Sequence, residues 1–158
     1  MSPRTTPESA CTILCPVDFS ATSRTALQCA ATIAQRFDGH LVVLFVNDPL
    51  LVAAASAASD RRGLVATSAR ELRRFAGRAL RGRRVRRVSC HSAVGVPPQE
   101  ILKAARQFGC GVIVMGTSGV GAVGRLFFGS TIDRVLRATE IPVVAVPPAR
   151  KLSTSRKK

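Results

Sequence analysis

Short runs of apolar, mostly β-branched residues alternate along this chain with longer segments in which apolar residues recur at helical spacing. The five short runs are Thr12 to Val17, Leu41 to Asn47, Val85 to Val94, Gly111 to Met115 and Pro142 to Val146. This alternation is typical of βαβ units and a parallel sheet. Three of the runs are almost continuously hydrophobic, as expected for strands that helices cover on both faces. The pattern predicts an open, doubly wound α/β fold of the Rossmann-like kind, with five parallel strands.

The longer segments predict four helices. The first begins after Ser20, a credible N-cap, and ends at Gly39, where glycine can adopt the left-handed conformation. Its expected buried stripe is Leu27, Ala30, Ala34 and Phe37. The second helix is expected over Ala53 to Leu80, because apolar and small residues recur at helical spacing. They are Leu64, Ser68, Leu72, Phe75 and Ala79.

The two remaining helices flank the fourth strand. Pro97 and Pro98 open one of them, which turns Ile101, Ala105 and Phe108 toward the core and stops at Gly109. The other starts at Gly129 to Thr131 and is expected to bury Ile132, Val135 and Leu136. One domain is expected over residues 10–148, between a disordered N-terminus (1–9) and a basic, disordered tail (149–158).

Length and composition limit the number of domains and the cellular compartment that we expect. A chain of 158 residues can bury one core without disulfide or metal staples. Its longest apolar run, Leu41 to Val46, is far shorter than the roughly 20 residues that cross a bilayer. The first ten residues lack the apolar middle of a secretory signal, and the five cysteines include no CxxC pair. We therefore expect a cytoplasmic protein with no membrane association, in which Cys11 and Cys15 serve as small buried hydrophobes.

The formal net charge of +15 attracts anions of any kind and cannot by itself choose among them. Eleven arginines lie between Arg61 and Arg87, and helical spacing places four of them, Arg70, Arg74, Arg78 and Arg81, in one row. No aromatic residue interleaves with them and no sequence-reading motif appears, so specific nucleic-acid recognition is not expected. The segment is interpreted as a solvated face, with only non-specific nucleic-acid contact left open.

The distinctive chemistry lies between Met115 and Thr131, where a buried strand passes into a helix through a glycine-rich segment. In open α/β sheets, ligands bind at such places. Gly119, Gly121 and Gly124 form a literal GxGxxG, but the pattern does not pass directly into a helix as a dinucleotide fingerprint should. Gly124 to Thr131 has P-loop spacing, with Ser130 where the phosphate-binding lysine belongs. Free N–H groups at the Gly129 to Thr131 helix start would nevertheless favour an anion.

A third pattern, G-x2-G-x9-G-S/T, is filled by Gly116, Gly119, Gly129 and Ser130. It resembles the ATP-binding motif of the universal stress protein family. The resemblance covers roughly residues 10–148 and includes the segments ILCPVDFSATSRTALQCAATIA, VGVPPQEILKAA and IPVVAVP. One departure is visible at Cys110 to Val112, where the family usually has an acidic residue. An alternative is a tight glycine loop without a ligand, as in some members of this family.

The resemblance implies a site for ATP or a related adenine nucleotide. It would place Pro16, Val17 and Asp18 beside the adenine and ribose, and Val46 against the base. Met115 and Gly116 would line the nucleoside, while Gly119, Gly129, Ser130 and Thr131 would hold the phosphates. These residues converge at the topological switch point if the strand order is 3-2-1-4-5.

The remaining expectations concern activity and assembly. No catalytic base is evident, since His40 and His91 are interpreted as structural or surface residues, so hydrolysis is expected to be slow at most. Mg²⁺ is expected only as a partner of the triphosphate. The last strand, Pro142 to Pro147, would be an apolar sheet edge, and the resemblance implies a homodimer paired through it.

Overall fold

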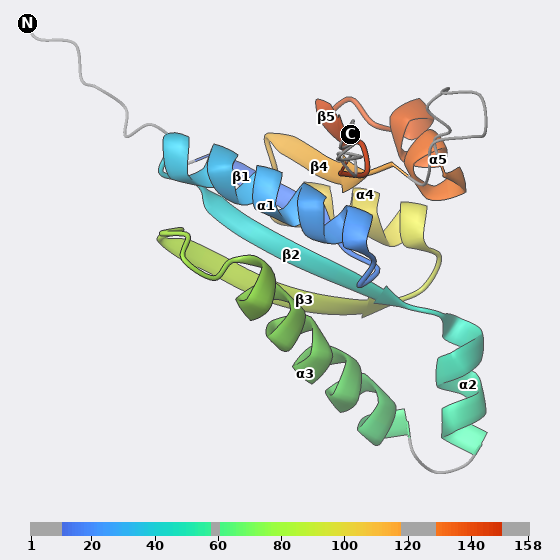
Figure 1. The fold of residues 1–158 in the computed structure, drawn as a ribbon. Coiled ribbons are helices and arrows are strands. Elements are labelled where there is room, and N and C mark those ends of the chain that lie inside the picture. The colour runs from blue at the N-terminus through green and yellow to red at the C-terminus, as the bar shows by residue number, and fades with distance from the viewer. Residues whose placement is uncertain (1–10, 58–60, 118–128, 150–158) are drawn as a thin grey trace, which may run out of the picture.

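A five-stranded parallel sheet with strand order β3-β2-β1-β4-β5 forms the centre of the computed structural model (Figure 1). The structure describes residues 11–57, 61–117 and 129–149. The predicted fold class and strand order are therefore confirmed. The strands are β1 (Thr12–Pro16), β2 (His40–Asn47), β3 (Arg87–Val94), β4 (Val112–Gly116) and β5 (Val143–Val146). The helices are α1 (Ala21–Arg36), α2 (Pro49–Ala57), α3 (Arg61–Ala79), α4 (Pro97–Gln107) and α5 (Ser130–Ala138).

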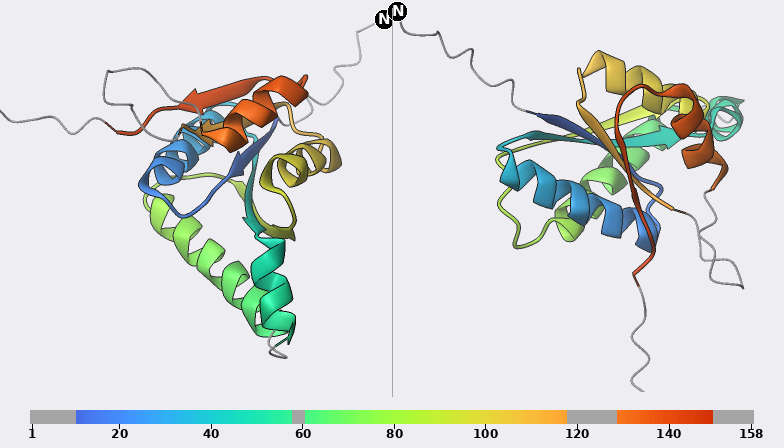
Figure 2. Two further views of the ribbon diagram at one scale, coloured as in Figure 1. Left: turned by 90° about the vertical axis from the view of Figure 1, so that its right-hand side faces the viewer. Right: turned by 90° about the horizontal axis from the view of Figure 1, so that it is seen from above.

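Helices cover both faces of the sheet (Figure 2). One apolar cluster joins α1 and α3 to alternate strand residues such as Ile13 and Val43, and a second joins α4 and α5 to the intervening residues, such as Leu14 and Val42. Because successive strand side chains point to opposite faces, a strand buried on both faces must be apolar throughout. This explains the continuous hydrophobic runs of the central strands.

The predicted N-cap of α1 is confirmed, because the Ser20 hydroxyl accepts a hydrogen bond from the Ser23 N–H at 3.1 Å. The end of α1 differs from the prediction. Asp38, not Gly39, takes the positive φ of 47°. A Cβ on Gly39 would collide with the Cys11 carbonyl oxygen, so glycine is needed there for close packing between β1 and β2. Phe37, expected in the buried stripe, is 67% exposed because it lies at the C-cap, beyond the last turn that faces the sheet.

The single helix expected over Ala53 to Leu80 is wrong, because the structure has two helices there. α2 begins at Pro49, and α3 begins at Arg61 and runs back along the sheet in a different direction (Figure 1). α3 keeps the predicted buried positions Ser68, Leu72, Phe75 and Ala79. A helical period continues across a break between two helices if both bury an apolar side, so periodicity alone did not locate it.

The other predicted helix signals are confirmed with one exception. Prolines occupy the first turn of α4, and Gly109 beyond its end has a φ of 59°. In α5, Ile132 and Val135 are buried, but Leu136 is 41% exposed. The short α5 turns only a narrow stripe toward the sheet, and Leu136 lies outside it. All five cysteines are free thiols, and burial raises the pKa of the Cys15 thiol.

None of the helices in the described ranges is both long and apolar enough to cross a membrane. The expected disordered segments, 1–9 and 149–158, lie outside the described residues apart from Ala149.

Candidate functional site

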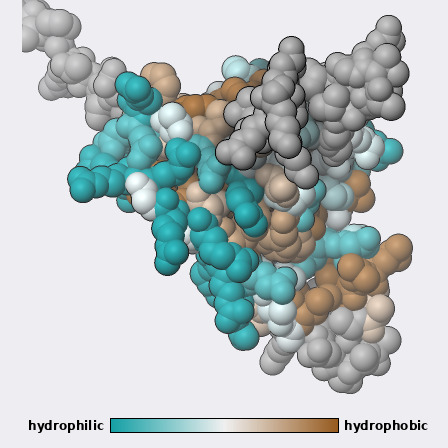
Figure 3. All heavy atoms as spheres, viewed as in Figure 1, coloured by the Kyte–Doolittle hydropathy of each residue, from teal (hydrophilic) through white to brown (hydrophobic). Residues whose placement is uncertain are grey.

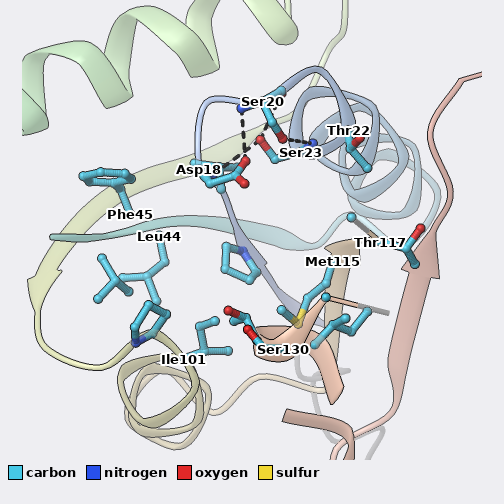
Figure 4. Close-up of a pocket in the computed structure, with 18 residues that line it drawn as sticks. Asp18, Ser20, Thr22, Ser23, Leu44, Phe45, Ile101, Met115, Thr117 and Ser130 are labelled. Carbon is cyan, nitrogen blue, oxygen red and sulfur yellow. Dashed lines mark hydrogen bonds between the residues drawn. The ribbon is translucent and has the colours of Figure 1, made fainter. Parts of the chain in front are cut away.

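A cavity of about 400 Å³ opens at the carboxyl ends of β1 and β4 (Figure 4). It lies where the chain order reverses, since β1 has β2 on one side and β4 on the other. Loops that leave such neighbouring strands diverge to opposite faces of the sheet and leave a crevice between them. The cavity is walled by the end of β1, the end of β2, the starts of α1 and α4, the end of β4 and the start of α5.

The turn after β1 forms the polar side of the cavity. The Val17 N–H donates to the Leu44 carbonyl at 2.8 Å, which holds the strand end against β2. The Asp18 carboxylate accepts the Ser20 N–H at 3.0 Å, and the Ser23 hydroxyl lies 3.4 Å from the Asp18 N–H. Figure 4 shows this group of hydrogen bonds at the top of the cavity. The Asp18 side chain is therefore oriented by its own turn.

The pKa of the Asp18 carboxyl falls below its ordinary value. Partial burial would raise it, but hydrogen bonds from Ser20 and Ser23 together outweigh that effect. Asp18 is the only carboxylate among the described residues that line the cavity. The site thus presents one ionised acceptor at neutral pH.

Contacts among three aromatic rings stabilise the same turn. Phe19 has a positive φ of 65°, which is unusual for a bulky residue. Its ring stacks on Phe45 with centroids 4.4 Å apart and meets the edge of Phe75 at 5.4 Å. These contacts fix the strained residue in place, so the chain can turn sharply beside Asp18.

The end of β4 supplies a close-packed wall. A Cβ on Gly116 would lie 2.9 Å from Thr22 Cγ2 and 3.1 Å from the Thr22 backbone. Gly116 is thus required by the approach of β4 to the first turn of α1. The adjacent Thr117 is 1% exposed, and its N–H donates to the Val146 carbonyl at 2.9 Å. Its hydroxyl has no hydrogen-bond partner among the described residues.

The start of α5 offers backbone donors. Gly129 is the N-cap and makes no side-chain cap, and the first backbone hydrogen bond of the helix runs from the Asp133 N–H to the Gly129 carbonyl at 3.1 Å. The three preceding N–H groups, of Ser130, Thr131 and Ile132, have no partner within the helix. They carry the positive end of the helix dipole, which favours an anion.

The rest of the wall is apolar and comes from β2, α4 and α5. Leu44 and Ile101 are buried, Val46 is half-buried, and Ile132 closes the floor. The cavity therefore joins an apolar side to a side of backbone donors, a combination that suits a ligand with a flat apolar part and an anionic part.

The structure brings nine of the ten predicted site residues to this one cavity, and the tenth, Gly119, lies outside the described residues together with Gly121 and Gly124. The nine are Pro16, Val17, Asp18, Val46, Met115, Gly116, Gly129, Ser130 and Thr131. Sequence reasoning missed the other lining residues, which are Ser20, Thr22, Ser23, Leu44, Phe45, Pro97, Ile101, Thr117 and Ile132. Those at the start of α1 could have been found, because a helix that follows a parallel strand begins at the carboxyl edge.

Other residues with candidate chemistry lie away from the cavity. A dinucleotide fingerprint needs an acidic residue some 20 positions after its glycines. Glu140 lies near that spacing, but it precedes β5 and is therefore at the amino edge of the sheet. His40 bonds Ser89 at 2.8 Å, and burial lowers its pKa, while His91 packs on Phe108. In the described part of the chain, no three histidine, cysteine or acidic side chains come together as metal ligands.

Comparison with known proteins gives consistent results. Residues 11–147 match the model of the universal stress protein family. A universal stress protein of Methanocaldococcus jannaschii is 30% identical over 152 residues, which cover 88% of this chain and 83% of that protein.

Two solved structures have the same fold. The universal stress protein UspA from Lactobacillus plantarum is 27% identical with a TM-score of 0.65, over 86% of this chain and 97% of that one. A universal stress protein in complex with cAMP is 19% identical with a TM-score of 0.64, over 89% and 98%. The family match spans every strand and helix that the structure describes, and the chain therefore belongs to the universal stress protein family.

Proposed function

We propose that this protein binds an adenine nucleotide, ATP, in the cavity between β1 and β4. The observation that carries the proposal is that nine residues from four separate segments, selected by a nucleotide-binding pattern, line a single cavity at the switch point. Its volume of about 400 Å³ falls within the range of small-molecule sites. A structurally similar family member binds cAMP, another adenine nucleotide, which adds support.

The two sides of the cavity suit the two parts of the ligand. The apolar side, with Val17 and Val46, would take the adenine, and the ionised Asp18 would accept hydrogen bonds from the ribose or base. Met115 and Gly116 would line the nucleoside. The N–H groups at the start of α5, with the Ser130 and Thr131 hydroxyls, would hold the phosphates, and Gly119 would approach them through its backbone.

The donor set fits binding better than hydrolysis. The described lining contains no histidine, lysine or arginine, and Asp18, with its lowered pKa, is a weak base. Mg²⁺ would be held by the triphosphate itself. A nucleotide-dependent regulatory role in the stress response, with at most slow ATP hydrolysis, is the function these residues support.

The first test is to denature the purified protein and identify any released nucleotide by mass spectrometry, then titrate the empty protein calorimetrically with ATP and with NAD⁺. Binding of ATP and a raised melting temperature are expected, because a ligand that binds only the native state stabilises it. Tighter binding of NAD⁺ would instead support the dinucleotide pattern at Gly119, Gly121 and Gly124. No binding of either would favour a stress protein that acts without a nucleotide.

A pair of variants at the first residue of α5 tests the phosphate site. Ser130→Pro removes one free N–H, and proline is tolerated at this helical position. The preceding Gly129 has φ −61° and ψ 158°, which a following proline accepts. We expect Ser130→Pro to weaken ATP binding at least tenfold with an unchanged melting temperature, while Ser130→Ala, which keeps the N–H, loses much less. Equal affinity of all three proteins would contradict the phosphate assignment.

A second pair addresses the glycine pattern. Gly119→Val is expected to abolish ATP binding, because a side chain there would occupy the space in which backbone meets phosphate. Gly121→Ala is the control, since it lies in the nine-residue spacer, and it should keep most of the affinity. Loss of binding only in Gly121→Ala would show that the GxGxxG pattern is the one in use.

We also propose a homodimer paired through β5, which is the sheet edge. The Ile113 and Thr117 N–H groups donate to the Pro142 and Val146 carbonyls, so the alternate residues of β5, Val143 and Ala145, turn their backbone groups outward. Ala145→Pro would remove only an outward N–H, whereas Ala145→Val keeps it. Light scattering should report a dimer for the wild type and Ala145→Val and a monomer for Ala145→Pro. A monomeric wild type would refute the dimer.

A further inference from the structure

The exposed side of α3 carries a row of arginines that do not line the proposed nucleotide site. Arg70, Arg74 and Arg78 of α3, and Arg81 in the turn that follows it, are all exposed, and we call these four residues the arginine face. Residues four apart on a helix are separated by about 6 Å along its axis, so Arg70 and Arg78 are about 12 Å apart. The row therefore follows the axis of α3 from Arg70 to Arg78, with a gradual drift around the helix, and continues into the next turn at Arg81.

The charge of this region is largely uncompensated. Residues 61–87 contain eleven arginines and one acidic residue, Glu71. Arg86 pairs with Asp38 at 2.7 Å and Arg83 donates to the Thr32 hydroxyl, but within the described residues the arginine face makes no ion pair. Like charges held in a row repel one another unless an anion lies against them. An extended anion would relieve that repulsion.

The buried side of α3 fixes the orientation of the helix and therefore keeps the arginine face toward solvent. Leu72, Phe75, Ala76 and Ala79 are buried against the sheet and α1, and they fix the rotation of the helix. The one aromatic ring of α3, Phe75, is 3% exposed and cannot stack on a base. The arginine face thus has neither apolar nor aromatic residues among its charges.

The surface over α3 is hydrophilic, whereas the neighbouring surface over α2 is hydrophobic. Figure 3 shows hydrophilic side chains gathered over α3 and the adjoining part of α1, apart from the hydrophobic surface of α2. Among the described side chains of α2, the large apolar ones that are exposed are Leu50 and Leu51, at 77% and 64%. A helix that lies on a membrane presents apolar residues flanked by its cations, which the arginine face does not. The row therefore fits a polyanion rather than a lipid surface.

We propose that the arginine face binds the phosphate backbone of double-stranded nucleic acid without reading its sequence. B-form DNA carries one charge per roughly 3.4 Å of axis on each strand, so about three or four phosphates of one strand lie along the 12 Å between Arg70 and Arg78. Arginine bonds phosphate oxygens through two parallel N–H groups, which suits a regular row of phosphates. The absence of exposed rings on α3 disfavours single strands, which are bound by stacking.

The test compares two variants of equal charge by fluorescence anisotropy with a random 24-base-pair DNA duplex across a salt series. Arg70→Gln/Arg74→Gln/Arg78→Gln removes three charges from the arginine face and keeps good helix formers. The control, Lys103→Gln/Arg106→Gln/Arg134→Gln, removes three exposed charges from α4 and α5, on the other face of the sheet. Circular dichroism melting checks that both remain folded.

We expect the arginine-face variant to bind at least tenfold more weakly than the control near 0.1 M salt. Each lost phosphate contact lowers the slope of log affinity against log salt by about one, so its slope should fall by about three. Failure of the wild type to bind the duplex, equal affinities of the two variants, or tighter binding of a single strand of the same length would each overturn the proposal. Preferential binding of the wild type to anionic phospholipid vesicles would overturn it in favour of a membrane.

Discussion

The cavity and the arginine face are both suited to phosphate, yet they are built in opposite ways. The cavity contains no cationic side chain among its described lining residues and offers backbone N–H groups next to an apolar wall. The arginine face offers only exposed guanidinium groups. Fixed, partly buried dipoles select a ligand by shape, whereas exposed charges attract any polyanion within a Debye length. The high net charge of this chain therefore does not indicate which ligand the cavity binds.

The largest expected difference between the two regions is in how their binding affinities depend on salt concentration. Raising the salt from about 0.05 to 0.2 M should weaken duplex binding by about fortyfold or more if three or more phosphates are neutralised. ATP binding should change by only a few fold, because the proposed phosphate donors are neutral N–H and hydroxyl groups and the adenine would be held by apolar contact. Titrations of both ligands in the same buffers measure this. A parallel collapse of the two affinities would show that ATP, too, binds through surface arginines.

Gly116 tests how tightly the cavity is packed. Gly116→Ala would place a methyl group against the Thr22 backbone, which cannot move without shifting the start of α1. Overpacking of this kind costs about 1–3 kcal/mol, and the same shift should weaken ATP binding. Urea denaturation and calorimetry give the two values. Full retention of stability would mean that β4 and α1 are not in close contact.

Gly77 tests whether the exposed side of α3 has room for an added side chain, in contrast to Gly116. It lies within α3, its φ is not positive, and a Cβ there would meet no atom within 4 Å. Gly77→Ala should therefore stabilise the protein by about 0.5–1 kcal/mol, through a smaller loss of backbone entropy on folding. Urea denaturation should show this gain with ATP affinity unchanged. A loss of stability instead would indicate that α3 is more crowded than its exposed face suggests.

Asp18 should give the smallest effect, visible only in acid. Its folded-state pKa is lower than its unfolded value, so it contributes stability above the unfolded pKa that is lost as pH falls through the folded pKa. Asp18→Asn can still accept the Ser20 N–H but does not titrate. The stability of the wild type should therefore fall more steeply than that of Asp18→Asn below about pH 4. Identical acid profiles would contradict the lowered pKa.

Much of the candidate site could be predicted because its residues fall in short segments next to strand ends. A parallel sheet brings all carboxyl ends of its strands to one edge. Once the strands were identified, Pro16 to Asp18, Val46, Met115 and the start of α5 had to lie near one another. The resemblance to the universal stress protein motif then implied which of these strand ends form the site.

Packing partners could not be predicted in the same way. The sequence marked Gly116 and Gly39 as special, but only the structure showed that Thr22 and Cys11 come too close to allow a side chain there. Phe45 and Ile101 were identified as strand and helix residues, but the place of Phe45 in the cavity wall depends on its contact with Phe19, and that of Ile101 on how α4 packs against the sheet. Such contacts join residues far apart in the chain, and no local pattern records them.

The order of apolar and polar residues by itself predicted five parallel strands with helices on both faces, because local periodicity and right-handed crossovers leave few other arrangements. The position of the switch point followed only once the strand order was taken as 3-2-1-4-5, which the structure confirms. The tertiary structure alone decided where the segment after β2 divides into α2 and α3 and which side chains close the cavity. Those features depend on which surfaces can be buried together. Burial is a property of the assembled chain, since each apolar face is covered by residues that the sequence places dozens of positions away.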